Sequence, residues 1–300
     1  MRSLAATHEI LERRARLLGA VRSFFAAGGF MEVETPCLVD EPIPERFIDA
    51  PPVGDRYLAP SPEVHMKQLL AAGFDRIFQV SKCFRLGERG ARHLPEFTML
   101  EWYRTGADYR DLAADAHGLL KAAADALGLP EPASCRGNTV MLRGMPEFIA
   151  VDDAFRTHAG IELADEPDAF VFDAALVERV EPRLGLRRPA FLHDYPSCFC
   201  PMAKRTQERP ARAERLELYI AGLEIANGCT EIADPALQER TLHAEQDARI
   251  RQGKDPYPWP AAFMNALRSL PPCAGMALGI DRLLMALTDT ASIDGVVAFA

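Results

Sequence analysis

The chain has 300 residues, enough for one large domain or two, and its 48% hydrophobic and 26% charged residues are typical of a soluble globular protein. Its formal net charge of -9 argues against a broad nucleic-acid-binding surface. The N-terminus is charged, no apolar run approaches the length of a membrane span, and the seven cysteines show no zinc-site pairing. We therefore expect a cytoplasmic protein with reduced cysteines and no membrane contact.

The first predicted element is a helix over residues 8–27, with an apolar face and Gly28-Gly29 at its end. An alternating segment, FMEVETPCLV, follows and is broken by Pro36. Residues 40–60 are rich in Pro and Asp and are expected to form loop and short strands.

A second helix is predicted to start in SPEVHMKQLLAAG, with Ser61 as N-cap and Pro62 at the first helical position. Glu63 lies in the first turn, where the helix dipole favours a carboxylate. That role is sufficient to explain it. The alternative is that Glu63 faces a pocket and binds an ammonium group.

Two strands joined by a basic loop are predicted at 77–84 and 96–103. The loop carries four basic side chains: Arg85, Arg89, Arg92 and His93. Guanidinium groups suit phosphate binding, although composition alone favours a solvated arginine turn on an ordinary hairpin. Alternation places four side chains on one face of the second strand, where they suit a ring and an amine: Phe97, Met99, Glu101 and Tyr103.

The middle of the chain contains no candidate site residues. An Ala/Leu-rich helix is predicted at 108–128 and a loop at 131–145. Residues 146–186 are predicted to be helices forming an insertion packed on the main domain. A strand is predicted at 189–196.

Residues 215–232 are predicted to form a hairpin through Gly222. Asn227 and Glu231 share a strand face, whereas Glu224 would face away unless a bulge at Asn227-Gly228 brings it round. Carboxylates facing one cavity can hold a divalent metal or an amine. Otherwise they are solvent-side residues of an edge strand.

An exposed helix is predicted at 235–252, and the apolar segment 273–288 is predicted to run from strand to helix. Ala277 shares a strand face with Gly275 and Gly279, so this face has room for a ligand. Arg282 at the strand–helix junction requires a partner, such as a stacked nucleotide base.

Three segments resemble, in order, the three signature motifs of class II aminoacyl-tRNA synthetases: GGFMEVETPCLV, CFRLGERGARHLPEFTMLEWY and GMALGIDR. RHLPEFTMLEWY and GLEIANGCTEIAD are similar to the lysyl-tRNA synthetase core in particular. The resemblance spans nearly the whole chain and implies an α+β fold with an antiparallel sheet flanked by helices. The two hairpins favour the same class, and the sequence has no Rossmann or P-loop glycine pattern.

The chain begins directly with the first motif's helix, so we expect one catalytic domain over 1–300 without an anticodon-binding domain. This short form resembles the elongation factor P–(R)-β-lysine ligase family, which has Ala at position 277 where lysyl-tRNA synthetases have Gly. The resemblance implies ATP- and Mg²⁺-dependent activation of (R)-β-lysine to an adenylate and its transfer to a lysine ε-amine of elongation factor P. It also implies a homodimer through the first helix and its strand, and no use of tRNA.

Two alternatives remain. One is a tRNA-independent ligase that uses α-lysine or modifies another acceptor. The other is a catalytically silent paralogue that only binds an amino acid or nucleotide.

The resemblance also implies roles for individual residues. Those implied to bind ATP are Arg85, Leu86, Gly87, Glu88, His93, Leu94, Phe97, Glu224, Ile225, Gly279 and Arg282. Those implied to bind the amino acid are Ser61, Pro62, Glu63, Glu101, Tyr103, Asn227, Glu231 and Ala277. Catalysis is assigned to Arg85, Glu224, Glu231 and Arg282, and Mg²⁺ binding to Glu224 and Glu231.

Within this set, Arg85 would hold the α-phosphate and the substrate carboxylate, and Phe97 with Arg282 would sandwich the adenine. The sequence departs from the family pattern at two places in the ATP loop. Gly87 occupies the usual glutamate position, with Glu88 one residue later, and Leu94 stands where Asn is usual.

Overall fold

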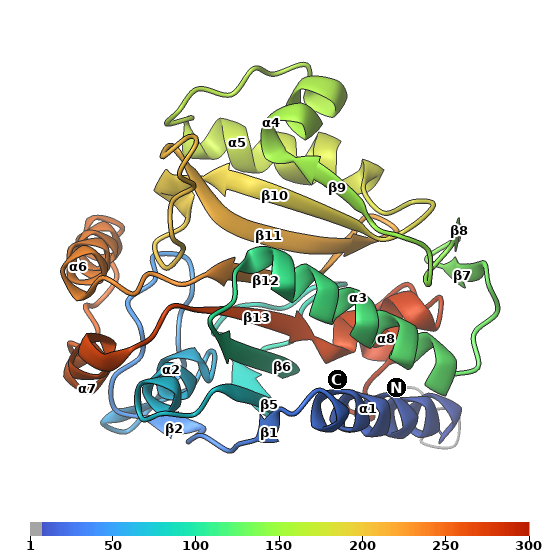
Figure 1. Cartoon of the computed structure of the whole chain (residues 1–300), viewed down its shortest axis with the longest axis horizontal. Helices are drawn as coiled ribbons and strands as arrows, with labels where there is room; N and C mark the ends of the chain where they lie inside the picture. The colour runs from blue at the N-terminus through green and yellow to red at the C-terminus, as the bar shows by residue number, and fades with distance from the viewer. Residues whose placement is uncertain (1–7, 300) are drawn as a thin grey trace.

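The centre of the protein is an eight-stranded sheet (Figure 1), seen in a computed structural model that describes residues 8–299. The strands in spatial order are β1 (Met31–Glu32), β5 (Arg76–Phe84), β6 (Glu96–Thr105), β13 (Cys273–Gly279), β12 (Leu223–Thr230), β11 (Arg212–Ile220), β10 (Ala190–Pro196) and β9 (Glu147–Ala150). From β5 to β10 neighbouring strands are antiparallel, as predicted. The edge pairs β1–β5 and β9–β10 are parallel, so the sheet as a whole is mixed.

Helices flank this sheet on both faces. The main ones are α1 (His8–Ala27), α2 (Glu63–Ala71), α3 (Tyr109–Ala126), α6 (Pro235–Arg251), α7 (Ala261–Ala266) and α8 (Ile280–Leu287). Shorter elements are β2 (Leu38–Val39), β3 (Pro52–Val53), β4 (Arg56–Leu58), β7 (Ala133–Cys135), β8 (Asn138–Val140), α4 (Val151–Ala154) and α5 (Ala169–Ala175). The predicted α+β class is confirmed.

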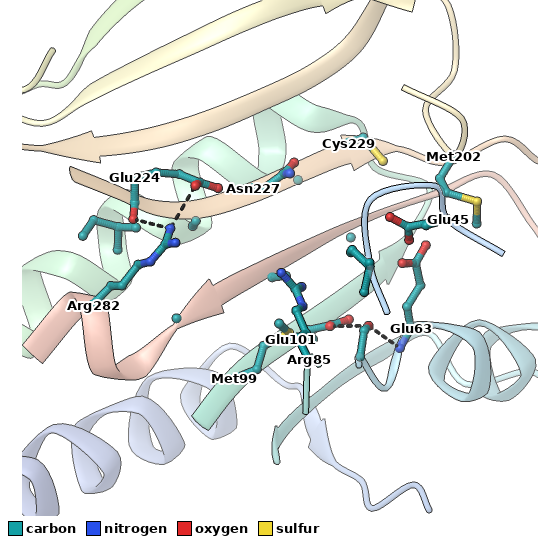
Figure 2. A pocket seen from close by; sticks show the side chains of 18 of the residues that line it. Glu45, Glu63, Arg85, Met99, Glu101, Met202, Glu224, Asn227, Cys229 and Arg282 are labelled. Atoms are coloured by element: carbon teal, nitrogen blue, oxygen red, sulfur yellow. Dashed lines mark hydrogen bonds and ion pairs between the residues drawn. The ribbon is translucent and has the colours of Figure 1, made fainter. Parts of the chain in front are cut away.

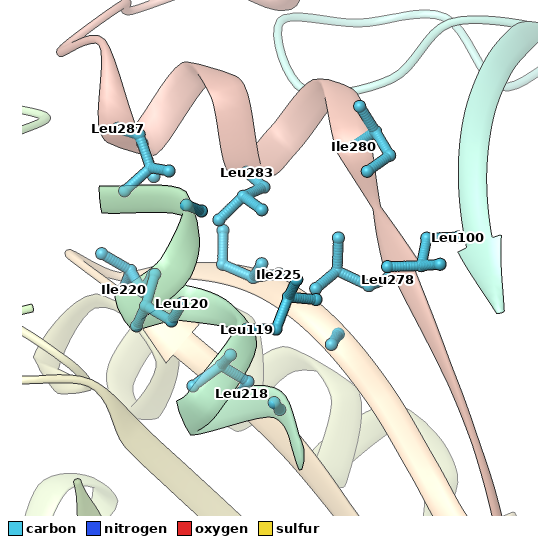
Figure 3. Close-up of a cluster of buried hydrophobic side chains, with 14 of the residues drawn as sticks. Leu100, Leu119, Leu120, Leu218, Ile220, Ile225, Leu278, Ile280, Leu283 and Leu287 are labelled. Atoms are coloured by element: carbon cyan, nitrogen blue, oxygen red, sulfur yellow. The ribbon is translucent and has the colours of Figure 1, made fainter. Parts of the chain in front are cut away.

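One face of the sheet is covered by α1, α3 and α8 and holds the main hydrophobic core. Figure 3 shows Leu119 and Leu120 of α3 and Leu283 of α8 meeting Leu218 and Leu278 of the sheet. Alternation along each strand sends these side chains to the core and their sequence neighbours to the opposite face. A cavity lies on that opposite face and is described below.

The hairpin β11–β12 contains the predicted bulge, but at a different residue. Leu218 pairs with Ala226 and Tyr219 pairs with Glu224, so Ile225 is the extra residue. Ile225 and Ala226 are both buried in the core, and the bulge therefore turns Glu224 to the side of Asn227. The predicted position of the bulge, Asn227-Gly228, was wrong. The bulge lies at Ile225 because the two consecutive apolar side chains of Ile225 and Ala226 both pack into the core.

The segment predicted as a loop at 131–145 contains the small hairpin β7–β8. The predicted helical insertion at 146–186 also starts with a strand, β9, which extends the central sheet. Its helices α4 and α5 then pack with β10 and β11 around a second apolar cluster. The insertion therefore adds one strand, β9, to the main sheet, and its helices form a layer that packs on the sheet.

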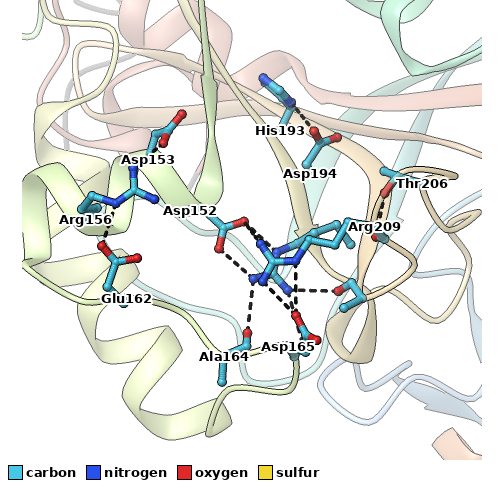
Figure 4. Close-up of polar contacts among 12 residues, drawn as sticks. Asp152, Asp153, Arg156, Glu162, Ala164, Asp165, His193, Asp194, Thr206 and Arg209 are labelled. Carbon is cyan, nitrogen blue, oxygen red and sulfur yellow. Dashed lines mark hydrogen bonds and ion pairs between the residues drawn. The ribbon is translucent and has the colours of Figure 1, made fainter.

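Ion pairs tie this insertion to β11 (Figure 4). Arg212 is 2% exposed, and its Nη2 and Nε atoms lie 2.7 and 2.8 Å from the two carboxylate oxygens of Asp152. Arg209 donates to Asp165 at 2.8 Å. A buried arginine must be paired, and this bidentate contact fixes the insertion against the sheet.

Across residues 8–299, none of the helices combines the length and the apolar character that crossing a bilayer requires. The helix predicted to start at Pro62 begins one residue later, at Glu63, with Pro62 rather than Ser61 as N-cap, and the Ser61 hydroxyl accepts a hydrogen bond from the Glu63 amide at 2.9 Å.

Candidate active site

A cavity of about 510 Å³ opens on the sheet face opposite the main core. Its floor consists of the inward-facing residues of β6, β12 and β13, and the loops around Glu45 and Arg85 border it. Sixteen of the predicted site residues line it: Ser61, Glu63, Arg85, Glu88, His93, Leu94, Phe97, Glu101, Tyr103, Glu224, Ile225, Asn227, Glu231, Ala277, Gly279 and Arg282. The lining does not include Pro62, Leu86 or Gly87.

The backbone of the basic loop is restrained at Gly87, where the sequence departs from the family pattern. Gly87 has φ +78°, which an L side chain rarely adopts. Leu86 is 58% exposed and points away from the cavity. Glu88 lines the cavity with an oxygen 3.8 Å from Arg85 Nη1, whereas the side chain of Leu94 is buried in the core.

Arg85 is an available cation of the cavity. Its guanidinium lies 5.2 Å from the centre of the Phe97 ring, and its Nε is buried without a hydrogen-bond partner among the described residues. The only ion pair that the structure gives it within residues 8–299 is the long contact to Glu88. Buried donors without partners are costly, and an anion in the cavity would satisfy them.

At one end of the cavity, Arg282 is paired with Glu224, with 2.9 Å between Nη1 and the carboxylate (Figure 2). Its Nη2 also contacts Nε2 of His93. Burial first, and then the positive charge of Arg282, lowers the pKa of His93, so this imidazole is held neutral. Sequence analysis indicated that Arg282 requires a partner. In the structure that partner is the carboxylate of Glu224.

Two carboxylates close to Glu224 were missed by sequence analysis. Glu217 of β11 is 5% exposed and accepts hydrogen bonds from Tyr195, Tyr219 and Arg215. Burial raises its pKa, and the charge of Glu224 raises it further. Glu181 is repelled by both, and its pKa is raised to about 7, mainly by burial.

The other end of the cavity holds a hydrogen-bonded set around Glu101, which is 1% exposed. Ser61 donates to one carboxylate oxygen at 2.6 Å and Tyr103 to the other at 3.0 Å. Burial raises the pKa of Glu101 to about 8, with a further contribution from the charge of Glu63. These three predicted residues are thus brought together, and they present acceptors suited to an amine.

Lys67 was also missed, although it organises this end. It is 2% exposed, and its Nζ lies 2.6 Å from Glu63 and 2.5 Å from Glu231. These two carboxylates outweigh the desolvation of the ammonium and raise the pKa of Lys67 well above its usual value. The spacing of Glu63 and Lys67 by one helical turn was a visible signal, but the link to Glu231 depends on the tertiary fold.

The third-motif strand runs between these groups, as its alternation predicted. Gly275, Ala277 and Gly279 all line the cavity, and their neighbours are buried in the core. In register, Ala277 lies between Glu101 of β6 and Asn227 of β12. A side chain at position 277 is therefore placed in the floor between two polar residues of the predicted substrate site.

Glu224 and Glu231 do not meet. They are seven residues apart along one extended segment, which separates them by roughly 20 Å at the usual rise of a strand. Glu231 is paired with Lys67, and no group of three or more His, Cys, Asp or Glu suited to a metal ion occurs among residues 8–299. The geometry does not support the predicted metal site shared by these two glutamates.

Comparison with known proteins identifies the family. The model of class II tRNA synthetases (D, K and N) matches residues 3–300. The chain belongs to this family. This confirms the resemblance found in the three sequence motifs.

The relatives include short and long proteins. A protein named elongation factor P–(R)-β-lysine ligase from Vibrio atlanticus is 35% identical over 312 residues, covering 98% of this chain and 96% of the relative. A protein of the same name from Pectobacterium carotovorum is 36% identical and covers 97% of this chain and 94% of its own length. A lysine–tRNA ligase from a Psychrobacter strain is 34% identical, but the match covers only 61% of that protein.

Proposed function

We propose that this class II synthetase is an ATP-dependent ligase that activates (R)-β-lysine and transfers it to a lysine ε-amine of elongation factor P. The observation that carries the proposal is the pairing, in one cavity, of an available guanidinium at Arg85 with an amine-binding set around Glu101. The near full-length similarity to proteins named as such ligases supports the choice of substrates.

The first step is attack of the substrate carboxylate oxygen on the α-phosphorus of ATP. A bond forms between carboxylate and phosphorus, the bond to the β-phosphate bridging oxygen breaks, and pyrophosphate leaves. Arg85 stabilises the negative charge that develops at the α-phosphate and also orients the carboxylate. In the second step the acceptor amine attacks the activated carbonyl, loses a proton, and AMP leaves.

The acidic end of the cavity binds the substrate amines. Glu101 and Tyr103, with Glu231 beyond them, receive the side-chain ammonium, and Glu63 faces the amine nearer the substrate carboxylate. Asn227 and Ala277 form the floor between the two ends.

At the other end, the carboxylate of Glu224, which lines the cavity, supplies oxygen donors of the kind that suit Mg²⁺. The metal would neutralise charge on the phosphates of ATP. Arg282 and Phe97 would sandwich the adenine, and His93 would reach the distal phosphates.

We also propose that the protein is a cytoplasmic homodimer formed through α1 and β1 and that it uses no tRNA. Met31 of β1 and Leu38 of β2 are 55% and 38% exposed, as apolar residues of an interface would be in an isolated chain. Sedimentation showing a stable monomer at micromolar concentration would contradict the dimer.

The test of the function is the intact mass of elongation factor P co-expressed with this protein. Supply of (R)-β-lysine should add the mass of one β-lysyl group, and an Arg85→Ala variant should not. Amino-acid-dependent pyrophosphate exchange with α- and β-lysine side by side distinguishes the alternative ligase. ATP binding without exchange would instead indicate a silent paralogue.

A further inference from the structure

Glu45, in the loop between β2 and β3, brings a further carboxylate to the amine end of the cavity. Figure 2 shows its carboxyl group pointing toward that of Glu63. The other acidic side chains at this end have partners: Glu63 and Glu231 share Lys67, and Glu101 accepts from two hydroxyls. The carboxyl of Glu45 has no hydrogen bond or ion pair within residues 8–299.

The main chain around Glu45 is held in place from α6. Arg249 is 3% exposed, and its Nη1 donates to the carbonyl oxygens of Glu45 and Ile48 at 2.8 and 3.0 Å. The next residue, Arg46, forms a bidentate contact with Glu245. The unpaired carboxyl is therefore built into the wall of the cavity.

This arrangement of two neighbouring carboxyls carries an electrostatic cost. Burial raises the pKa of Glu45 to about 7, and the charge of Glu63 contributes next. A fixed, partly buried carboxyl beside a second carboxylate offers a position for a cation that the described chain does not fill. Lys67 occupies one oxygen of Glu63, which leaves acceptor capacity on the side of Glu45.

We propose that Glu45 and Glu63 jointly bind the substrate amine nearer the carboxylate, which makes Glu45 a specificity-determining residue for diamino acids. This inference rests on the proposed function. It assigns the second substrate amine its own carboxylate, separate from the set around Glu101 that binds the side-chain amine. An ammonium donates three hydrogen bonds and is best satisfied by more than one acceptor.

The experiment compares two variants of the full chain, Glu45→Gln and the control Asp40→Asn, an exposed carboxylate of the same loop that does not line this cavity. Calorimetric titration is done with (R)-β-lysine and with two analogues. One is 6-aminohexanoic acid, which lacks the amine near the carboxylate, and the other is 3-aminohexanoic acid, which lacks the side-chain amine. Melting temperatures of the ligand-free proteins are measured in parallel.

Glu45→Gln should weaken binding of (R)-β-lysine and of 3-aminohexanoic acid by roughly tenfold or more, the usual worth of a hydrogen bond to a charged group. Binding of 6-aminohexanoic acid should change less than about twofold, since the amine that Glu45 contacts is missing from it. The ligand-free variant should melt at a higher temperature than wild type at pH 8, because a buried repulsion has been removed. Asp40→Asn should leave every binding value unchanged.

Equal losses for all three ligands, or a lowered melting temperature of the ligand-free variant, would assign Glu45 a structural role and overturn the inference. Unchanged binding of (R)-β-lysine to Glu45→Gln would do the same while leaving the proposed function intact. If the wild-type protein binds neither lysine isomer, the proposed function itself fails, and this inference fails with it.

Discussion

The ring of Tyr103 occupies the space that a β-carbon at Gly275 would need. The two residues are register partners in β6 and β13, and a Cβ built at Gly275 would overlap the edge of the ring. The glycine therefore lets Tyr103 lie across the neighbouring strand and donate to Glu101 at 3.0 Å.

Gly275→Ala should displace Tyr103 and lower kcat/KM for the amino acid by roughly tenfold or more, because positioning of the amine depends on this contact. The KM for ATP should remain near the wild-type value. Gly19→Ala is the control, since nothing lies within 4 Å of a Cβ at that position. A KM for the amino acid equal to that of wild type in Gly275→Ala would show that displacement of the Tyr103 ring does not affect binding of the amino acid.

Arg85→Ala should reduce amino-acid-dependent pyrophosphate exchange by roughly a hundredfold or more, as loss of a single charge-stabilising donor does elsewhere. The matched control is Arg89→Ala on the same loop, whose guanidinium pairs with Asp294 at 2.9 Å and does not line the cavity. Exchange at the wild-type rate in Arg85→Ala would refute the assigned role.

Part of this site could be predicted because successive side chains of a strand point to opposite faces of the sheet. Alternation in β6 and β13 correctly placed Glu101 and Tyr103 on one face and Ala277 on the matching face. The bulge was expected at Asn227-Gly228 because those residues permit it locally. It lies at Ile225 because the core on the other side of the sheet takes both Ile225 and Ala226.

Residues that act across elements could not be found in this way. The contact of Lys67 with Glu231 joins a helix to the end of a strand more than 160 residues later. Glu45 comes from an irregular loop, which has no periodicity to indicate where its side chain points. In both cases tertiary packing decides the partners, and local pattern carries no information about it.

Lys67→Met should lower the free energy of unfolding by about 3–5 kcal/mol at pH 8, because it leaves Glu63 and Glu231 buried without their cation. Lys82→Met is the control: its exposed pair with Glu96 at 3.1 Å should contribute less than about 1 kcal/mol. The measurement is urea unfolding of both variants. A loss for Lys67→Met no larger than for Lys82→Met would contradict the structural importance of the buried pair.

The pH dependence follows from Glu101, because burial raises its pKa to about 8 in the folded protein from the ordinary value of 4.5. The folded state retains a proton that the unfolded state releases, so the stability of the ligand-free protein should fall as pH rises from about 5 to 8. Amine binding requires the ionised carboxyl and should strengthen over pH 6.5 to 8.5.

Lys67 and Glu63 are the charged groups that act on Glu101, and both remain in Glu101→Gln. That variant should lose the part of the pH dependence near pH 8, while the contribution of Glu45, with a pKa of about 7, remains, as measured by calorimetry at several pH values. Identical pH profiles for the variant and wild type would assign the titration to another group.

The last prediction concerns Ala277, which lies in register between Glu101 and Asn227 in the floor of the cavity. (R)-β-lysine carries its amine one carbon further from the carboxylate than α-lysine does, so the two isomers must lie differently over this floor. A methyl group here raises the floor at the point where the carbon chain passes from the carboxylate end to the amine end. A methylene-sized change in a pocket shifts preference by about 1–3 kcal/mol. Ala277→Gly should therefore raise kcat/KM for α-lysine relative to (R)-β-lysine by roughly tenfold, with the melting temperature close to wild type. The measurement is the ratio of the two specificity constants in both proteins. An unchanged ratio would place selection elsewhere in the cavity, with the Glu45–Glu63 pair as the first position to examine.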